Sequence, residues 1–347
     1  MKELLIKDNQ PGANASSPMG LPWPAWKQIG NRMWLMMGFH NLSLLAAGTA
    51  FFVFLAISPL LAATVMTYGL LGDVDTVQRQ MMIIVELVPQ EAAGLIEEQL
   101  LAVVTTNSGV TGLTLVVSLA LAIFGGMRAA NGLIGALNII NSEHESRNII
   151  SKTLQAIGLT AAAVMIALTG LISGGMVAWL QSQTGDLIGP AAESFYKLLT
   201  WVIAMAIGSA GFALIMRYGP DRRAAKWRWL SPGSLLATFA WVAVSISFSL
   251  YVQYVSDYNA TYGSLSAIVV FLMWLFLTSY AILVGALLNA EIERQTHVDT
   301  TVGHDRPMGE RGAIMADVTV SAPVNEKLLE KKRRRKLERE ARRVSEG

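Results

Sequence analysis

The sequence predicts an all-helical, polytopic membrane protein with six transmembrane helices. Three observations predict this fold class. Of the 347 residues, 53% are hydrophobic and only 15% are charged, whereas soluble domains carry about 25% charged residues. The apolar residues form six runs, and a helix needs about 20 such residues to cross a bilayer. Lysine and arginine are almost confined to alternate connections between these runs.

The runs divide the chain into three parts. Residues 1–40 are expected to form a cytoplasmic arm that ends in a tryptophan-containing interfacial segment, residues 41–295 the membrane domain, and residues 296–347 a disordered linker with a basic, charged cytoplasmic tail. No removable signal peptide is evident, so the first span is expected to remain as an anchor. The spans are placed at about 42–71, 111–128, 153–180, 198–216, 232–255 and 263–290.

Two stretches in the first third of the chain interrupt the apolar pattern. Ser58-Pro59 lies inside the first span, and proline removes a helical hydrogen bond, so we expect a kink there. Residues 72–108 carry six acidic residues against the single base Arg79. Their apolar residues recur at helical spacing on both sides of Pro89, which predicts two short amphipathic helices on the outer side.

The last two spans form a predicted helical hairpin. Ser231 suits the N-cap of the first of these helices, and Pro232 suits its first turn, where a missing N–H is harmless. The polar turn 256–262 joins the two helices, and tyrosines gather around it. Such amphipathic rings favour the membrane interface.

The distribution of basic residues predicts the orientation. With both termini inside, 25 of the 27 lysines and arginines fall in inner segments, and the outer loops keep nine acidic residues. If the distant tail after residue 290 is left out, the split is still 12 to 2. Because inner loops carry the excess of basic residues, we expect a multi-pass protein of a bacterial inner membrane with both termini in the cytoplasm.

Composition argues against several chemistries. The chain has no cysteine and four histidines, and Glu143-His144-Glu145 lacks the paired histidines that place two ligands on one helix face. We therefore expect no metal and no cofactor. The basic tail is interleaved with acidic residues and has no aromatic residues on which bases could stack, so no nucleic-acid partner is expected.

The first candidate site is a polar stripe at the end of the second span. Arg128, Asn131 and Asn138 fall at helical steps on one face, and Asn141 follows. One interpretation is a polar cavity that binds an anionic headgroup or substrate, because ionisable groups inside membranes tend to be functional. In the other, Arg128 extends to the inner interface and the asparagines join helices by hydrogen bonds.

Two further candidate sets belong to the terminal hairpin. Asp257, Tyr258, Asn259 and Tyr262 form either an outer gate or headgroup-binding loop or simply a tight turn. Asn289 and Glu291 lie at the end of the last span. Glu291 and Glu293 are either a proton or cation site or the mark of a helix end in the interface.

Several short motifs between about residues 30 and 295 resemble the YihY/BrkB family of bacterial inner-membrane proteins. The most specific is the run from Tyr258 to Leu265, YNATYGSL. The others are Ala46–Phe51, Ser58-Pro59-Leu60, Ala136-Leu137-Asn138, Arg217–Pro220, Ser231–Ser234, Trp274, Gly285-Ala286 and Asn289–Glu291. The resemblance implies an all-helical inner-membrane fold. In that family an acidic residue often follows Gly-Ala in the last helix, where this chain has Leu287, with Glu291 one turn further on.

The family resemblance leaves the activity open, since the family was once labelled a ribonuclease and has been linked to serum resistance and envelope lipids. We expect transport or translocation of a lipid-like or anionic small molecule. The alternative is a non-enzymatic envelope scaffold or regulator that acts through partners. Ribonuclease chemistry needs clustered carboxylates or a placed acid and base, which the inner segments lack. The expected partners are the bilayer, anionic lipids and a second copy of the chain.

Overall fold

The computed structural model describes residues 10–71, 112–188, 190–254 and 266–320, with residues 57–71 described by their backbone alone. Within these ranges all regular elements are helices, and the one β-type contact is an isolated bridge between Ala225 and Thr301. The predicted amphipathic helices of residues 72–108 lie outside the described part. The elements are η1 (Pro18–Gly20), α1 (Trp23–Phe39), α2 (Leu42–Leu71), α5 (Gly112–Ile140), α6 (Ile149–Ile188), α7 (Pro190–Tyr218), α8 (Trp227–Tyr254), α10 (Ser266–Glu293) and α11 (Ile314–Asp317).

The prediction of an all-helical fold is confirmed for the described residues. Six long helices, α2, α5, α6, α7, α8 and α10, correspond to the six apolar runs. Three described stretches are long and apolar enough to cross a membrane, namely Leu198–Tyr218, Trp227–Gln253 and Ile268–Glu293. A fourth is added if α1 and the start of α2, bent by 63° at their junction, count as one broken span. The number six remains a prediction.

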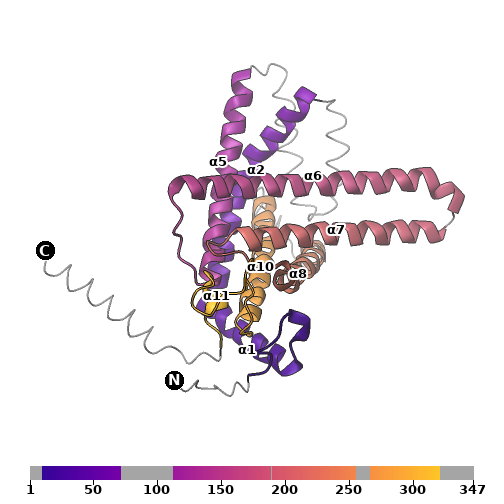
Figure 1. Ribbon diagram of the computed structural model, residues 1–347. Helices are drawn as coiled ribbons and strands as arrows, with labels where there is room; N and C mark the ends of the chain where they lie inside the picture. Colours follow the sequence, from indigo (N-terminus) through magenta and orange to yellow (C-terminus); the bar gives the residue numbers. More distant parts are fainter. Residues whose placement is uncertain (1–9, 72–111, 189, 255–265, 321–347) are drawn as a thin grey trace, which may run out of the picture.

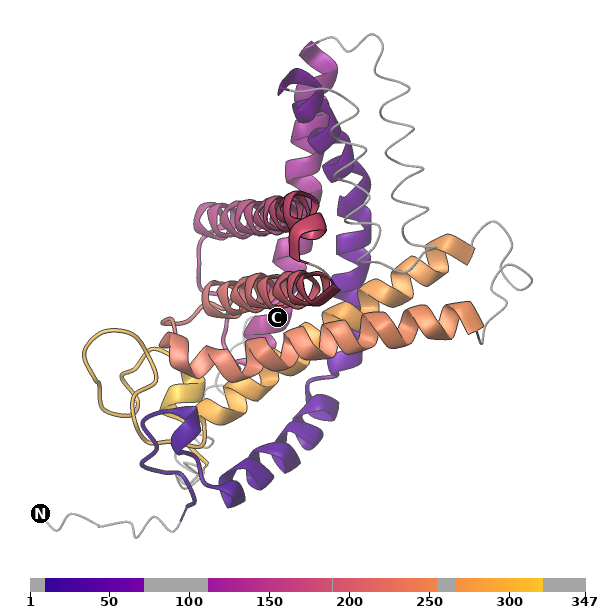
Figure 2. The ribbon, with the colours of Figure 1, turned by 90° about the vertical axis from the view of Figure 1, so that its right-hand side faces the viewer.

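The long helices are arranged as three antiparallel pairs. Helices α2 and α5 pack together, as do α6 with α7 and α8 with α10. In Figure 1 the α6–α7 pair runs across the direction of α2 and α5, and Figure 2 shows α8 and α10 side by side along a third direction. The pairs diverge from a shared base, where the main apolar core lies around Leu137, Leu283 and Leu287.

The closest crossing in the fold joins α8 to α10 through two glycines. A Cβ atom placed on Gly285 would lie 2.3 Å from the carbonyl oxygen of Gly233, and one on Gly233 would lie 2.1 Å from that of Gly285. No side chain fits at such distances, so the backbones touch directly. This contact fixes the base of the terminal hairpin.

Several helix boundaries differ from those predicted. The polar stretch 181–197 is not a loop, because α6 continues to Ile188 and α7 starts at Pro190, a residue well suited to the first helical position. Helix α8 starts at Trp227, so Ser231 is not its N-cap and Pro232 lies inside the helix. Pro232 cannot donate to the carbonyl of Arg228, and the Ser231 hydroxyl donates to it instead, at 3.0 Å.

The segment after α10 is also different from the prediction. Residues 296–320 were expected to be a disordered linker, yet Thr296, Thr300 and Thr301 are fully buried. Polar side chains stabilise this segment, because they bond its backbone where an apolar core is missing. Part of the N-terminal arm is folded too, since the His297 amide donates to the carbonyl of Ala13 at 2.7 Å. Trp23 and Trp34 on α1 are exposed, and the interfacial position of the arm stays a prediction.

Candidate functional site

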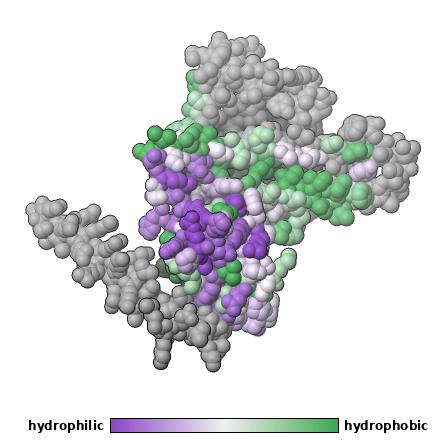
Figure 3. Space-filling model, in the orientation of Figure 1, coloured by the Kyte–Doolittle hydropathy of each residue, from purple (hydrophilic) through white to green (hydrophobic). Residues whose placement is uncertain are grey.

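Four segments far apart in the sequence meet at the base of the helix pairs. They are the N-terminal residues 10–39, the α5–α6 loop 141–148, the α7–α8 loop 219–226 and the segment 294–320. Figure 3 shows hydrophilic residues gathered in this region and apolar ones along the α6–α7 pair. All four segments were predicted to be cytoplasmic, and the structure places them at one end of the molecule. We call their polar contacts, with those of the adjoining helix ends, the basal cluster.

The centre of the basal cluster is a buried ion pair between Arg222 and Glu293. The guanidinium donates to both carboxylate oxygens, with Nη1–Oε2 at 2.6 Å and Nη2–Oε1 at 3.0 Å. The two side chains are only 5% and 3% exposed. Arg222 Nη1 also donates to Asn141 Oδ1 at 2.9 Å. The pair therefore ties the α7–α8 loop to the end of α10 and to the end of α5, in the two-pronged geometry that suits arginine and carboxylate.

A small cavity lies beside this pair, with an accessible volume of about 10 Å³. That space holds about one water molecule. Its lining comes from α7, α8, α10, the α7–α8 loop and the first residue after α5, and consists of Asn141, Met216, Arg217, Arg222, Ala225, Leu230, Ala286, Asn289, Ala290 and Glu293. In this conformation the cavity is too small for a lipid headgroup or a metabolite.

Asn289 joins α10 to α8 at the cavity wall. Its Oδ1 accepts from the amide of Gly233 at 2.8 Å, and its Nδ2 donates to the carbonyl of Leu230 at 3.0 Å and contacts Met216 sulfur at 3.3 Å. Pro232 interrupts the helical hydrogen-bond pattern just here, and the amide side chain satisfies backbone groups next to the break. In this structure Asn289 has a packing role.

Glu291 lies two residues after Asn289 on α10 and is 1% exposed. It accepts from Arg32 Nε of α1 at 2.7 Å and from Arg294 Nη1 at 3.1 Å. Arg32 also donates to the side chain of Gln295 at 2.8 Å. A carboxylate held by two arginines is a poor acceptor for a further cation, so this geometry favours a joint between α1 and α10.

Asn138 lies near the end of α5 and bonds both the α5–α6 loop and the α7–α8 loop. Its Nδ2 donates to Glu145 at 3.0 Å, and its Oδ1 accepts from the Asp221 amide at 2.7 Å. Arg147 forms two hydrogen bonds with Glu145, at 2.7 and 2.8 Å. These bonds lower the pKa of Glu145 below its usual value. Burial raises the pKa of Asp221, but hydrogen bonds from Ser146 outweigh it, and the net pKa is lowered.

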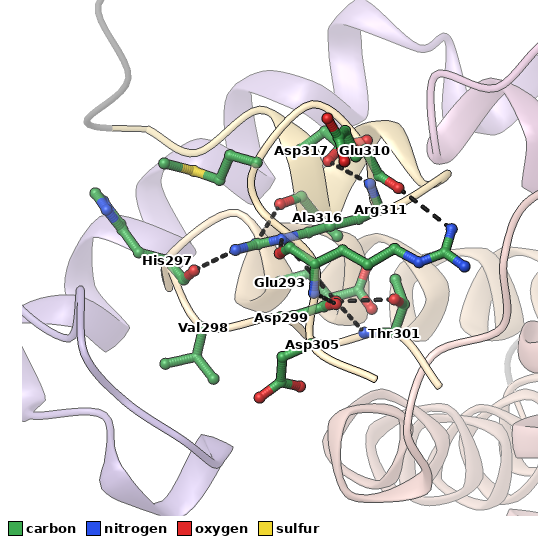
Figure 4. Close-up of polar contacts among 12 residues, drawn as sticks. Glu293, His297, Val298, Asp299, Thr301, Asp305, Glu310, Arg311, Ala316 and Asp317 are labelled. Carbon is green, nitrogen blue, oxygen red and sulfur yellow. Dashed lines mark hydrogen bonds and ion pairs between the residues drawn. The ribbon is translucent and has the colours of Figure 1, made fainter. Parts of the chain in front are cut away.

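The segment 294–320 is held together by its own polar contacts, which Figure 4 shows around Arg311 and Asp299. Arg311 is buried and donates to the carbonyls of Ala316 and His297, at 2.8 and 2.5 Å. Asp299 accepts from the amides of Thr301 and Arg306. Burial raises the pKa of Asp299, but these bonds outweigh it and leave the pKa lowered.

This segment also bonds both inner loops. The amide of Ile314 donates to Glu143 Oε1 at 2.7 Å, and the amide of Arg223 donates to the carbonyl of Gly312 at 2.9 Å. Burial raises the pKa of Glu143, although the bond from Ile314 opposes it. The bridge between Ala225 and Thr301 adds a third contact. We call residues 294–320 the C-terminal clasp.

The predicted polar stripe is divided in the structure. Asn138 and Asn141 are buried in the basal cluster, whereas Arg128 is exposed, with its Cζ atom 5.1 Å from the centre of the Phe124 ring. Asn131 is half-buried, and its Oδ1 has no hydrogen-bond partner among the described residues. The four residues therefore do not line one cavity.

The remaining candidate residues lie partly beyond the structure. Asp257, Tyr258, Asn259 and Tyr262 fall outside the described residues. Ser58 and Pro59 lie within the helical backbone of α2, and the predicted kink stays a prediction. No group of three potential metal ligands occurs in the part of the chain that was described.

Sequence reasoning did not select Arg222, Arg32, Arg147 or Asp221 as site residues. Arg222, Arg147 and Asp221 come from segments that looked like solvated inner loops, and Arg32 comes from the segment predicted to lie at the membrane interface. A signal was present nonetheless, because every predicted inner segment carries both acidic and basic residues. Acidic and basic residues that lie on the same side of a membrane can form ion pairs with one another.

The fold and the site define a class, a helical protein with long apolar helices and a polar cluster at one end. The family described as "Virulence factor BrkB" matches residues 33–308. The chain therefore belongs to this family of membrane proteins.

Curated relatives support this assignment. The chain is 27% identical over 177 residues to "Putative ribonuclease-like protein YfkH" of Bacillus subtilis, a match over 50% of this chain and 64% of the relative. It is 28% identical over 159 residues to a UPF0761 membrane protein of Idiomarina loihiensis, over 46% and 54% of the two chains. A UPF0761 membrane protein of Rhodospirillum rubrum matches 73% of this chain at 27% identity. The matches thus span less than two thirds of these relatives. No solved structure matches the chain.

Proposed function

We propose that this chain is a six-span inner-membrane protein that translocates an anionic, lipid-like small molecule, and that the basal cluster is its closed cytoplasmic gate. The observation that carries the proposal is the Arg222–Glu293 pair, buried beside a water-sized cavity where four helix ends and two loops meet. Ionisable groups buried inside membrane segments are costly and tend to be functional, and Glu293 is the last residue of the candidate span Ile268–Glu293.

The contacts explain how such a gate would open. A substrate can enter only if α5, α7, α8 and α10 separate around the cavity, and the Arg222–Glu293 pair with Asn141 spans three of their ends. Breaking the pair would release a guanidinium and a carboxylate, which lipid phosphates and water can solvate. Asn141 Oδ1, which accepts from Arg222, then becomes free to bond a polar headgroup.

The six-span topology is part of this proposal. Helix α6 has 40 residues, a length of about 60 Å at about 1.5 Å per residue, twice the hydrocarbon thickness of about 30 Å. Exposed apolar side chains such as Met165, Met176 and Leu198 lie along the α6–α7 pair and need an apolar environment. In a flat bilayer this pair must lie closer to the direction of α2 than it does in Figure 1, and the loops 141–148 and 219–226 are the joints.

The alternative function is a non-enzymatic envelope scaffold. It is favoured by the C-terminal clasp, whose polar groups are bonded within the chain and hold both inner loops together. We do not propose ribonuclease activity, although one relative is called ribonuclease-like. The acidic side chains Glu145, Glu291 and Glu293 are held by arginines and are not arranged as an acid–base pair.

Flux measurements in liposomes test the proposal. Purified protein should accelerate the movement of a fluorescent phosphatidylglycerol analogue between leaflets, measured by chemical quenching of the outer leaflet. The Arg222→Met/Glu293→Met double variant should move it faster, because the gate is weakened without leaving a lone charge. Asp305→Asn is the matched control and should equal the wild type, because it removes an exposed ion pair with Lys226 at the outer edge of the basal cluster, away from the cavity lining.

Two results would contradict the proposal. The first is a wild-type rate equal to that of protein-free liposomes for phosphatidylglycerol, phosphatidylcholine and small organic anions. The second is a stoichiometric partner in native purifications that is lost when residues 321–347 are deleted, which would favour the scaffold.

A further inference from the structure

The last turn of α7 holds an arginine that the basal cluster leaves without an acidic partner. Arg217 is the last basic residue of α7. Its Cζ atom lies 4.5 Å from the centre of the Trp227 ring and 5.4 Å from that of Tyr218. Its Nη1 donates to the carbonyl of Ala225. Its Nε is buried without a hydrogen-bond partner, and no carboxylate pairs with it among the described residues.

The place of Arg217 in the fold is at the edge of the apolar helices. One candidate span ends at Tyr218, and the next begins at Trp227. Both rings are partly open, with Trp227 49% and Tyr218 44% exposed. Tryptophan and tyrosine concentrate at the level of lipid headgroups. A guanidinium stacked between them therefore lies at the height of lipid phosphates.

The surface of α8 continues this site with an apolar strip. Exposed Leu235 and Phe239 lie 8 and 12 residues after Trp227, on the same face of the helix, with exposed Ser231 between Trp227 and Leu235. The strip leads from the arginine toward the middle of the candidate span. An acyl chain can lie on such a strip while its phosphate faces the arginine.

We propose that Arg217, with Trp227, binds the phosphate of an anionic phospholipid of the adjacent leaflet. The fixed planar fork of arginine suits a phosphate oxygen pair, and the ring holds the guanidinium in place. Basic side chains at the cytoplasmic ends of membrane helices are typical sites for anionic headgroups. The proposal rests on the membrane topology of the proposed function, but it does not require translocation.

The first turn of α8 offers a matched control. Arg228 is exposed, and its side chain has no bond among the described residues. Arg217→Gln and Arg228→Gln remove the same charge from the two helix ends that flank the α7–α8 loop. A diffuse electrostatic attraction would respond equally to both changes, whereas a built site responds to the first.

The experiment titrates detergent-purified full-length protein with phosphatidylglycerol and follows bound lipid by native mass spectrometry. We expect Arg217→Gln to weaken binding about tenfold or more, the loss of a charge-assisted hydrogen bond, and Arg228→Gln by less than about threefold. Arg217→Lys should fall between them, because it keeps the charge without the planar fork. Phosphatidylcholine should bind more weakly than phosphatidylglycerol.

Three results would overturn the proposal. They are equal losses for Arg217→Gln and Arg228→Gln, equal binding of the two lipids, and full competition by inorganic phosphate, which would assign the site to a soluble anion. Thermal midpoints without lipid check folding. If Arg217→Gln does not fold, Trp227→Leu decides at unchanged net charge, and its affinity must fall. Lipid binding at Arg217 can be present whether or not the protein accelerates lipid movement in liposomes. A failure of the binding proposal is therefore distinguishable from a failure of the translocation proposal.

Discussion

Removing Arg222 should destabilise the protein more than any exposed charge change. Glu293 is 3% exposed and is held by Arg222 through two hydrogen bonds. Taking one partner from a buried pair leaves an uncompensated charge and costs about 3–5 kcal/mol. We therefore expect Arg222→Met to lower the free energy of unfolding by about that amount. The exposed pair of Lys226 with Asp305, itself 73% exposed, should contribute about 0–1 kcal/mol.

The double variant separates charge from packing. Arg222→Met/Glu293→Met replaces the pair by apolar side chains and leaves only the Asn141 acceptor unpaired, which costs about 1–3 kcal/mol. The double variant should therefore be more stable than Arg222→Met alone. Reversible unfolding in mixed detergent–SDS micelles measures all three variants. The reasoning is refuted if Arg222→Met and Asp305→Asn unfold at the same SDS fraction, or if the double variant is the least stable.

Three further changes test the neighbouring contacts. Gly285→Ala places a Cβ atom 2.3 Å from the Gly233 carbonyl oxygen and should lower the free energy of unfolding by about 1–3 kcal/mol. Gly135→Ala, with open space around it, should be neutral or stabilising by up to about 1 kcal/mol in the same unfolding assay. Equal effects of the two changes would contradict the close crossing. Asn289→Leu leaves two buried backbone groups of α8 unpaired and should cost about 1–3 kcal/mol in that assay, so an unchanged stability would refute its packing role. Burial raises the pKa of Glu143, so the contribution of Glu143 to folding stability is present below the unfolded pKa of about 4.3 and is lost as pH rises through the folded pKa. Glu143→Gln should therefore raise the thermal midpoint at pH 7 and leave it unchanged at pH 4. A gain of equal size at both pH values would contradict this reasoning.

The helices could be predicted from sequence because apolar runs of this length have few other solutions. In lipid, every backbone group must be bonded within the segment, so an apolar run becomes a helix. The positions at which the helices begin and end are harder to predict from the same rule. Residues 181–188 are polar but contain no proline, and α6 continues through them. Pro232 was expected to open α8, but the Ser231 hydroxyl compensates for its missing N–H inside the helix.

The basal cluster could be predicted only in part. Asn138, Asn141, Asn289 and Glu291 stood out as polar residues at the ends of apolar runs, and all four are buried there. Their partners could not be identified, because Arg222 and Arg32 come from segments whose folding depends on contacts distant in sequence. The order of residues 296–320 depends on side-chain bonds to backbone, such as those of Arg311, which leave no periodic pattern.

The central claim is that both termini and both inner loops gather on the cytoplasmic side of one membrane. The chain has no cysteine, so single cysteines can report accessibility directly. Met19, His144 and His304 are exposed positions in three of the four basal segments, and position 107 lies in a predicted outer loop. In intact cells, a membrane-impermeant maleimide should label Asn107→Cys and should label Met19→Cys, His144→Cys and His304→Cys only after the membrane is opened. Labelling of any of these three in intact cells, with position 107 protected, would contradict the account.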